Sequence, residues 1–150
     1  MRLTSKGRYA VMAMADLSVH GAHGMVRLQE IAARQAISQP YLEQLFSRLK
    51  RAGLVEGVRG PNGGYRLSRP AEEVSVAEVI AAVDETIATN ACRAGGPIGC
   101  TGRKERCLTH NLWAALGDRI NDFLDDVSLA DLAAGRVAPA AAVEPAEARA

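Results

Sequence analysis

Residues 38–53 and 54–70 read SQPYLEQLFSRLKRAG and LVEGVRGPNGGYRLSRP, and these two adjacent stretches decide the fold. The first predicts a helix with clear ends, because Ser38 suits an N-cap, Pro40 falls in the first turn and Gly53 follows the last turn. Its apolar residues recur at the spacing of one buried helical face. They are Leu42, Leu45, Phe46 and Leu49.

The second stretch predicts a β-hairpin. Two strand-like runs, residues 54–58 and 65–67, flank the tip Gly-Pro-Asn-Gly-Gly, which consists of turn-forming residues throughout. Upstream, the periodicity of residues 6–21 and 27–38 indicates two further helices. Three helices followed by a basic hairpin predict a mainly α fold with a small β-hairpin, namely a winged helix-turn-helix.

The charge is unevenly distributed along the chain. Residues 1–69 contain 11 Lys and Arg against 4 Asp and Glu, whereas residues 70–150 contain 7 against 13. A basic front half and an acidic back half indicate an anionic partner for the front half, either a nucleic acid or a membrane surface. The alternative is a solvated face of scattered arginines.

The composition gives no sign of a membrane or export route. No apolar run approaches the roughly 20 residues that a membrane span requires. The N-terminal stretch carries Asp16 within its apolar part and has no small-residue cleavage site after it, so we expect no export signal. Three cysteines is an odd number and a poor basis for a disulfide framework. We therefore expect reduced thiols in a cytoplasmic protein.

The start of the third helix is expected to read DNA, because in a helix-turn-helix this end of the second helix of the pair meets base edges in the major groove. A Gln side chain pairs with adenine, and a carboxylate accepts from the cytosine amino group. Glu43 stands out, because phosphate repels a carboxylate unless a base donor meets it; the alternative is a surface salt bridge to Arg48 or Lys50. The candidates for base contact are Ser38, Gln39, Tyr41, Glu43 and Gln44.

The hairpin is expected to add a second DNA contact. Its glycine-rich tip lets Arg59 approach a minor groove that a bulkier loop does not enter; an ordinary hairpin turn is the alternative. Other basic residues are expected to contact phosphates, which positions the protein on DNA without reading the sequence. These residues are Lys6, Arg8, Arg48, Lys50, Arg51 and Arg66.

The back half contains further expected helices. Ser75 and Glu78 form a capping box at the start of a linking helix. Beyond it, an apolar stripe predicts a long helix that needs a partner, and we favour a symmetric dimer over packing on its own domain. The stripe consists of Leu112, Leu116, Ile120, Phe123, Leu124 and Val127. The expected organisation is a DNA-binding domain at 1–70, a linking helix at 71–89, a ligand loop at 90–110, a dimerisation helix with a short terminal helix at 111–135, and a disordered tail at 136–150.

All three cysteines lie in one glycine-rich stretch, NACRAGGPIGCTGRKERCLTHNLW at residues 90–113. Basic residues within it moderate the repulsion among three thiolates and favour the thiolate form. The intervals between the ligands are short enough for one loop to surround one inorganic centre. Three thiolates and one imidazole suit zinc as well as iron, so the spacing does not decide the metal. The candidate ligands are Cys92, Cys100, Cys107 and His110.

Several blocks in order, MRLTSKGRYAV, YLEQLFSRL, VRGPNGGYRL, EVIAAVDE and CLTHNLW, carry a family resemblance. Over roughly residues 1–135 the chain resembles the iron–sulfur cluster regulators of the winged-helix family of bacterial transcription regulators. The resemblance implies a homodimeric transcription factor that binds double-stranded DNA operators. It also implies a 2Fe–2S cluster on the three cysteines and His110, supplied by the iron–sulfur assembly machinery. With its cluster such a protein mainly represses the cluster assembly genes, and it controls other genes with or without the cluster.

Two other functions are weighed against this one. The first is a nitric-oxide or redox-sensing regulator of the same family. The motifs CLTH and YLEQLFSRL, together with Glu43, instead favour the members that regulate iron–sulfur cluster biogenesis. The second is an enzyme or electron carrier that uses the cluster. The sequence contains no nucleotide-binding loop, no paired nucleophile and base, and no second cofactor motif. We therefore expect a regulator and not an enzyme.

Overall fold

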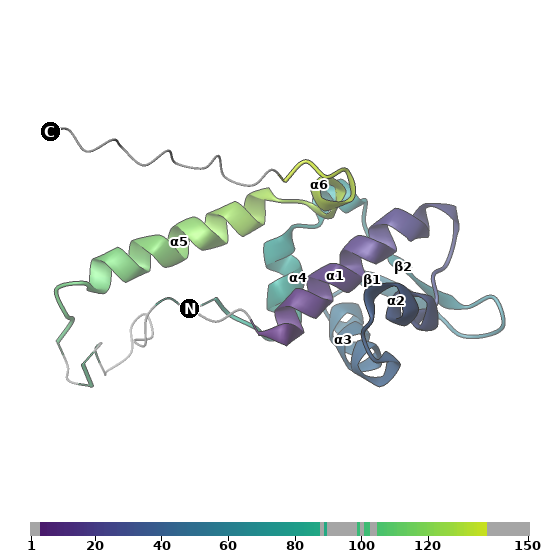
Figure 1. Cartoon of the computed structure of the whole chain (residues 1–150), viewed down its shortest axis with the longest axis horizontal. Helices are drawn as coiled ribbons and strands as arrows, with labels where there is room; N and C mark the ends of the chain where they lie inside the picture. The colour runs from purple at the N-terminus through teal and green to yellow at the C-terminus, as the bar shows by residue number, and fades with distance from the viewer. Residues whose placement is uncertain (1–3, 88, 90–98, 100, 103–104, 138–150) are drawn as a thin grey trace, which may run out of the picture.

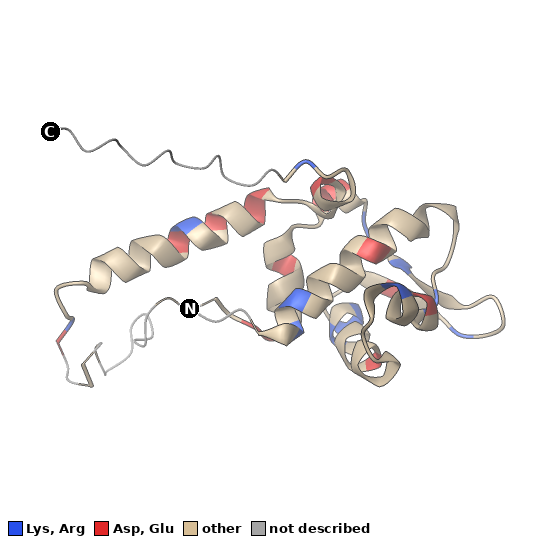
Figure 2. Cartoon of the chain, viewed as in Figure 1, with Lys and Arg blue, Asp and Glu red and all other residues tan. Residues whose placement is uncertain are grey.

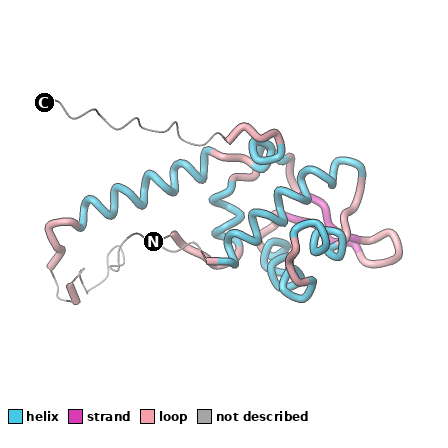
Figure 3. The backbone as a smooth tube through the Cα atoms, viewed as in Figure 1, coloured by secondary structure: helices cyan, strands magenta, loops and turns pink. Residues whose placement is uncertain are grey.

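A computed structural model of the chain describes residues 4–87, 89, 99, 101–102 and 105–137. The fold is mainly α with one antiparallel hairpin, as the sequence predicts (Figures 1 and 3). In order, the elements are α1 (Ser5–His20), η1 (Gly21–His23), α2 (Leu28–Gln35), α3 (Gln39–Arg51), β1 (Val55–Val58), β2 (Gly64–Leu67), η2 (Ala71–Glu73), α4 (Val76–Ala82), α5 (His110–Asp126) and α6 (Leu129–Ala133).

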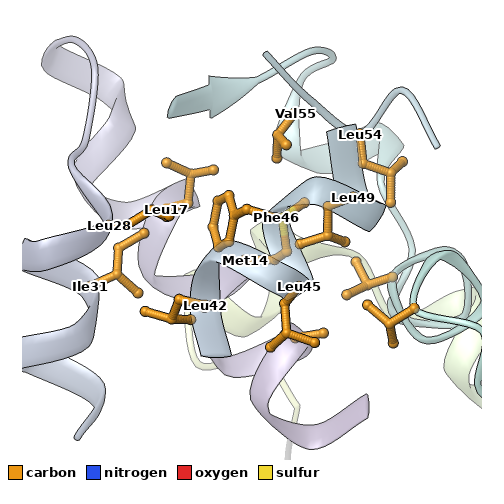
Figure 4. Packing of buried hydrophobic residues seen from close by; sticks show 14 of the residues in the cluster. Met14, Leu17, Leu28, Ile31, Leu42, Leu45, Phe46, Leu49, Leu54 and Val55 are labelled. Atoms are coloured by element: carbon orange, nitrogen blue, oxygen red, sulfur yellow. The ribbon is translucent and has the colours of Figure 1, made fainter. Parts of the chain in front are cut away.

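The core forms around α1 and the apolar face of α3. Helix α1 contacts α2, α3, α4, α6 and the hairpin, so it is the central element of the body. The four apolar residues expected on one face of α3 are all buried, and Phe46 has no exposed surface (Figure 4). Opposite them, α1 contributes Met14 and Leu17, and α2 contributes Ile31. The predicted buried stripe is confirmed.

The ends of α3 follow the sequence with one exception. Pro40 lies in the first turn, and Gly53, just after the helix, has a φ of +76°, which favours glycine. Ser38 occupies the N-cap position, but its hydroxyl makes no capping hydrogen bond in the described chain. The predicted N-cap position of Ser38 is therefore confirmed. The exposed Ser38 side chain lies at the end of the helix expected to meet DNA.

A buried charge joins α1 to α2, which the sequence did not predict. The carboxylate of Asp16 accepts three hydrogen bonds from Arg34, with the shortest at 2.7 Å, and one from Gln35 Nε2 at 2.8 Å. Burial alone would raise the pKa of Asp16, but these donors outweigh it and hold the pKa below its ordinary value. Asp16 therefore stays ionised and fixes the angle between the two helices.

The hairpin is attached to the helices at its second strand. Val26, just before α2, exchanges two backbone hydrogen bonds with Tyr65, at 2.9 and 2.7 Å. Gly64 allows this approach: its φ is +152°, and a Cβ there would lie 2.6 Å from the carbonyl oxygen of Val26. The Tyr65 ring meets Phe46 edge-on, with centroids 4.9 Å apart. The hairpin, hereafter the wing, thus has a defined position relative to α3.

The core continues past residue 70. Val74, Val79, Val83 and Leu129 are completely buried in the same cluster as the residues of α1 and α3. Helices α4 and α6 both contact α1. The predicted capping box is confirmed, since Ser75 and Glu78 each accept the other's backbone N–H. The domain boundary at residue 70 stays a prediction, and the core spans it.

Helix α5 extends away from this body (Figure 1). It contacts α4, and in the view of Figure 1 only its C-terminal end comes near the other helices. Four large apolar side chains of α5 are exposed, at 41% to 60% of their surface. They are Leu112, Trp113, Leu116 and Phe123. Ile120 and Leu124 are half-buried, and Val127 follows the helix instead of lying in it.

Two further expectations concern the ends of the chain and the membrane. From residue 138 onward the expected disordered tail lies outside the described residues. Among the helices that the structure describes, none is long and apolar enough to cross a membrane.

Candidate DNA interface and metal-ligand loop

The N-terminal half of α3 presents most of the expected base contacts to solvent. Ser38, Gln39, Glu43 and Gln44 are exposed. Tyr41 is half-buried, because its ring packs edge-on against Tyr9 with centroids 6.0 Å apart. The geometry therefore brings together a polar patch of amide, hydroxyl and carboxylate groups on one exposed end of a helix, the set that reads base edges in other helix-turn-helix proteins.

Glu43 is held by a neighbour on its own helix. Gln39 Nε2 donates to Glu43 Oε1 at 3.2 Å. In the part of the chain that the structure describes, Glu43 forms no ion pair with Arg48 or Lys50, the alternative considered from the sequence. Glu43 is therefore exposed, and its hydrogen-bond partner on the helix is the neutral Gln39.

The expected phosphate contacts differ in their surroundings. Arg8, Lys50, Arg51 and Arg59 are exposed and lie on α1, α3 and the wing (Figure 2). Arg66 is exposed but paired with Glu56 across the hairpin, at 2.8 Å. A pairing of this kind reduces the charge available to a phosphate. Their roles in DNA binding stay predictions.

Arg48 and Lys6 converge on the short segment that follows α4, residues 83–85. Arg48 pairs with the carboxylate of Asp84 and lies 3.4 Å from the carbonyl of Val83. Lys6 Nζ donates to the carbonyl of Asp84 at 3.1 Å. Asp84 has a φ of +55°, so the chain turns sharply here. The segment therefore binds the end of α3 and the start of α1 together.

The neighbouring Glu85 closes the same junction. Its carboxylate accepts the backbone N–H of Thr4 at 2.6 Å, at the N-terminus of α1. Burial would raise the pKa of Glu85, but the donors Thr4 and Gly7 and the nearby Lys6 hold it below its ordinary value. The contact between Glu85 and Thr4 was not predicted from the sequence, because these residues lie 81 positions apart. Glu85 lies a few residues ahead of the cysteine loop.

Two of the four candidate ligands lie within the described residues. His110 is the first residue of α5, and its backbone N–H donates to the carbonyl of Cys107 at 3.0 Å. Such an i to i+3 turn brings the two Cα atoms within about 7 Å, so both side chains belong to one local site. The thiol of Cys107 lies 3.4 Å from Thr109 Oγ1.

The other two candidate ligands, Cys92 and Cys100, lie outside the described residues. Within the described ranges no three His, Cys, Asp or Glu side chains are grouped to hold a metal. The donor set nevertheless fits a cluster, because thiolates and imidazole are the ligands of iron–sulfur and zinc centres. Cys107 is half-buried and His110 begins an exposed helix, so these two candidate ligands lie near the surface.

The body consists of three helices, of which the third exposes a polar face, and an attached basic wing. This arrangement defines a winged helix-turn-helix DNA-binding regulator. The family model described as "Rrf2: Iron-dependent Transcriptional regulator" matches residues 3–135. The chain therefore belongs to the Rrf2 family, and the resemblance seen in the sequence is confirmed.

Individual relatives agree with this assignment. The HTH-type transcriptional regulator IscR of Pectobacterium carotovorum is 55% identical over 132 residues, which cover 88% of this chain and 79% of the relative. The IscR of Photorhabdus laumondii is 57% identical over the same length, with the same coverage. The chain is accordingly similar to named transcription regulators, and we conclude that it is a DNA-binding transcription regulator and not an enzyme.

Solved structures support the same fold. The structure of T. potens IscR has a TM-score of 0.72 and 34% identity, covering 91% of this chain and 89% of that one. CymR, the global cysteine regulator of B. subtilis, has a TM-score of 0.76 and 30% identity, covering 90% of this chain and 98% of that one. In both cases the similarity covers nine tenths or more of this chain.

Proposed function

We propose that this regulator senses iron–sulfur cluster status through one 2Fe–2S cluster per chain and controls, mainly by repression, the genes for cluster assembly. The observation that carries the proposal is the grouping of every cysteine of the chain, with His110, in the one segment between the DNA-binding body and α5. The family description as iron-dependent and the relatives named IscR support it. The proposal includes a cytoplasmic location and the cluster assembly machinery as the donor.

Cys92, Cys100, Cys107 and His110 are the proposed ligands. A cluster with one neutral imidazole is less anionic than one held by four thiolates, and its retention depends on pH. The turn from Cys107 to His110 fixes two ligands relative to the start of α5. Through these two ligands the proposed site connects directly to the long helix.

The junction at residues 83–85 offers the route from the loop to the reading helix. This segment precedes the loop and holds Arg48 of α3 and Lys6 of α1 through Asp84. When the cluster binds or leaves, the loop changes its conformation and displaces Asp84. Through Arg48, this displacement reaches the end of α3. A small shift of α3 moves Glu43 toward or away from a cytosine amino group and so changes which operators are tolerated.

The exposed apolar face of α5 is the proposed dimer contact. Leu112, Trp113, Leu116 and Phe123 point into solvent on a helix that contacts the body through α4. A second copy of the chain can bury this face by a symmetric contact, which is the commonest arrangement in soluble oligomers. Two reading helices then meet two half-sites of one operator.

Cluster binding is tested by anaerobic purification followed by iron, sulfide and zinc analysis. We expect two irons and two sulfides per chain, because a 2Fe–2S centre contains two of each. Cys107→Ala and His110→Ala should lose the visible absorption and the iron, whereas His23→Ala, a surface histidine outside the loop, should retain both. Stoichiometric zinc without iron or sulfide would contradict the proposal.

DNA binding is tested by its dependence on salt. If about 6 to 10 phosphates are neutralised per dimer, affinity should fall by roughly 10³ to 10⁵ between 50 and 200 mM salt. A binding constant that does not respond to salt would rule out the basic front half as a phosphate-binding surface.

A further inference from the structure

We infer that a cationic pocket between α2, α3 and the wing binds one phosphate group, and that Arg27, which the sequence did not single out, completes it. The pocket has a volume of about 320 Å³. Its charged lining residues are Arg27, Lys50 and Arg59. The inference rests on the DNA binding proposed above, since the backbone of a duplex is the phosphate source in view.

The charges around the pocket have one sign. Arg27 is the residue just before α2, Lys50 lies in the last turn of α3, and Arg59 lies in the wing. In the described part of the chain, every charged side chain that lines the pocket is basic. The nearby Glu30 is not among the lining residues, and its carboxylate accepts the backbone N–H of Arg27 at 2.9 Å. Three cations from three separate elements attract an anion and leave no carboxylate in the pocket to repel it.

The lining suits a phosphate in shape as well as charge. Gly57, Gly60, Gly63 and Gly64 contribute much of the remaining wall. At Gly60 the space where a Cβ would lie is open, so a backbone phosphate can approach the main chain of the wing there, whereas at Gly57, Gly63 and Gly64 that space is filled by Tyr65, Val58 and Val26. A guanidinium offers five N–H donors in a planar fork that matches two phosphate oxygens. The pocket therefore offers guanidinium and ammonium donors to a phosphoryl group that enters it.

Arg27 is positioned before any ligand binds. Its Nη2 donates to the carbonyl of Pro61 at the tip of the wing, which uses one of the five donors and leaves the others for a ligand. The adjacent Val26 is joined to Tyr65 by the two backbone hydrogen bonds already described. Arg27 thus fixes the wing tip, and with it Arg59, against the reading helix.

This arrangement has a testable consequence for DNA binding. A contact with a phosphate positions the protein without reading the base sequence, so loss of Arg27 should weaken all operators alike. The contact should also appear in the salt dependence, because each neutralised phosphate adds about 0.9 to the slope of log K against log salt. Base-reading residues such as Glu43 should instead change the preference among operators.

The experiment measures that slope for four proteins on one operator and on one unrelated duplex. The proteins are the wild type, Arg27→Gln, Arg27→Lys and Arg136→Gln. The last removes the same charge from an exposed residue after α6, paired with Asp131. We expect Arg27→Gln to lower the slope by about 0.9 per chain on both duplexes and to weaken binding at least about tenfold. Arg27→Lys should keep the slope, and Arg136→Gln should match the wild type.

The outcomes separate the inference from the function on which it rests. A wild-type slope for Arg27→Gln, or an equal reduction for Arg136→Gln, overturns the inference while DNA binding stands. A wild type that binds no duplex overturns both. Inorganic phosphate, titrated at constant ionic strength, tests the other phosphate source. One outcome is that binding of inorganic phosphate depends on Arg27 while the salt slope of DNA binding does not. In that case the pocket binds free phosphate and the inference for DNA is wrong.

Discussion

Helices α3 and α5 carry the same spacing of apolar residues and use it differently. Leu42 and Phe46 of α3 have no exposed surface, whereas Leu112 and Phe123 of α5 expose 60% and 56% of theirs. Helix α3 is surrounded by α1, α2 and the wing, but α5 extends from the body (Figure 1). Amphipathic spacing therefore predicts that a helix buries one face, but not which surface covers it.

The contrast separates a body that packs against itself from a region for which we propose external partners. The body completes its own core, and its buried charge, Asp16, has its partners within the same chain. Helix α5 instead exposes four large apolar side chains, and we propose that it needs a second chain and that the loop before it needs a ligand. The four predictions below test this division, from the largest expected change in free energy to the smallest.

Phe46→Ala should damage the body most. Phe46 is fully buried and contacts Tyr65 of the wing, so its truncation leaves a cavity between α3 and the wing. We expect a loss of about 3–5 kcal/mol in the free energy of unfolding. Urea unfolding followed by circular dichroism measures it. A loss below about 1 kcal/mol would mean that the core is not built around α3.

Asp16→Asn should destabilise the body by about 2 kcal/mol, because donors of Arg34 and Gln35 lose a charged acceptor. The folded pKa of Asp16 lies below its ordinary value. Its stabilising effect is therefore present above the unfolded pKa, near 4, and is lost as the pH falls through the folded pKa. Thermal unfolding of both proteins from pH 6 to pH 2 should show curves that converge in acid. Parallel curves would show that Asp16 is not the titrating group.

Glu43→Ala should change operator choice by about 1–3 kcal/mol, the cost of one mismatched base pair. Under the proposed function the wild type binds one class of operator only with its cluster and a second class with or without it. The cluster-free variant should bind the first class as well. Arg59→Ala is the matched control and should weaken both operator classes in both states. The measurement is a set of anaerobic binding titrations. Discrimination equal to that of the wild type would reduce Glu43 to an ordinary surface charge.

Leu116→Ser and Phe123→Ser should change the folding of a single chain least. Both side chains are largely exposed, and substitutions at such positions usually fall within about 0.5 kcal/mol. Dimer formation should instead be strongly weakened, since the proposed dimer contact loses two apolar side chains. Sedimentation at micromolar concentration should show a dimer for the wild type and a monomer for the double variant. A wild-type monomer would remove the proposed role of α5.

The sequence predicted those parts of the fold that depend on neighbours along the chain. The helices, the α3 stripe, the hairpin and the Ser75 capping box follow from periodicity and local turn chemistry, and all are confirmed. Ser38 takes the predicted N-cap position without a capping hydrogen bond, because the position of a cap does not fix the rotamer of its side chain.

The contacts that the sequence did not predict join distant residues. Arg48 was considered as a phosphate contact or a partner of Glu43, but in the structure it pairs with Asp84. Arg27 is an ordinary arginine in the sequence and becomes part of a pocket only when the wing folds against α3. Such pairings depend on the tertiary arrangement, for which a single sequence carries no periodic signal.

The most direct test of the account is DNA binding by one anaerobic sample before and after removal of its cluster. The duplex is an operator of the cluster assembly genes, and the salt concentration is held constant. We expect cluster removal to weaken binding by roughly 5- to 150-fold, the usual range of coupling between two sites. Arg27→Gln should show the same ratio at lower affinity. Equal affinity of the loaded and cluster-free protein would contradict the claim that the loop controls the reading helix.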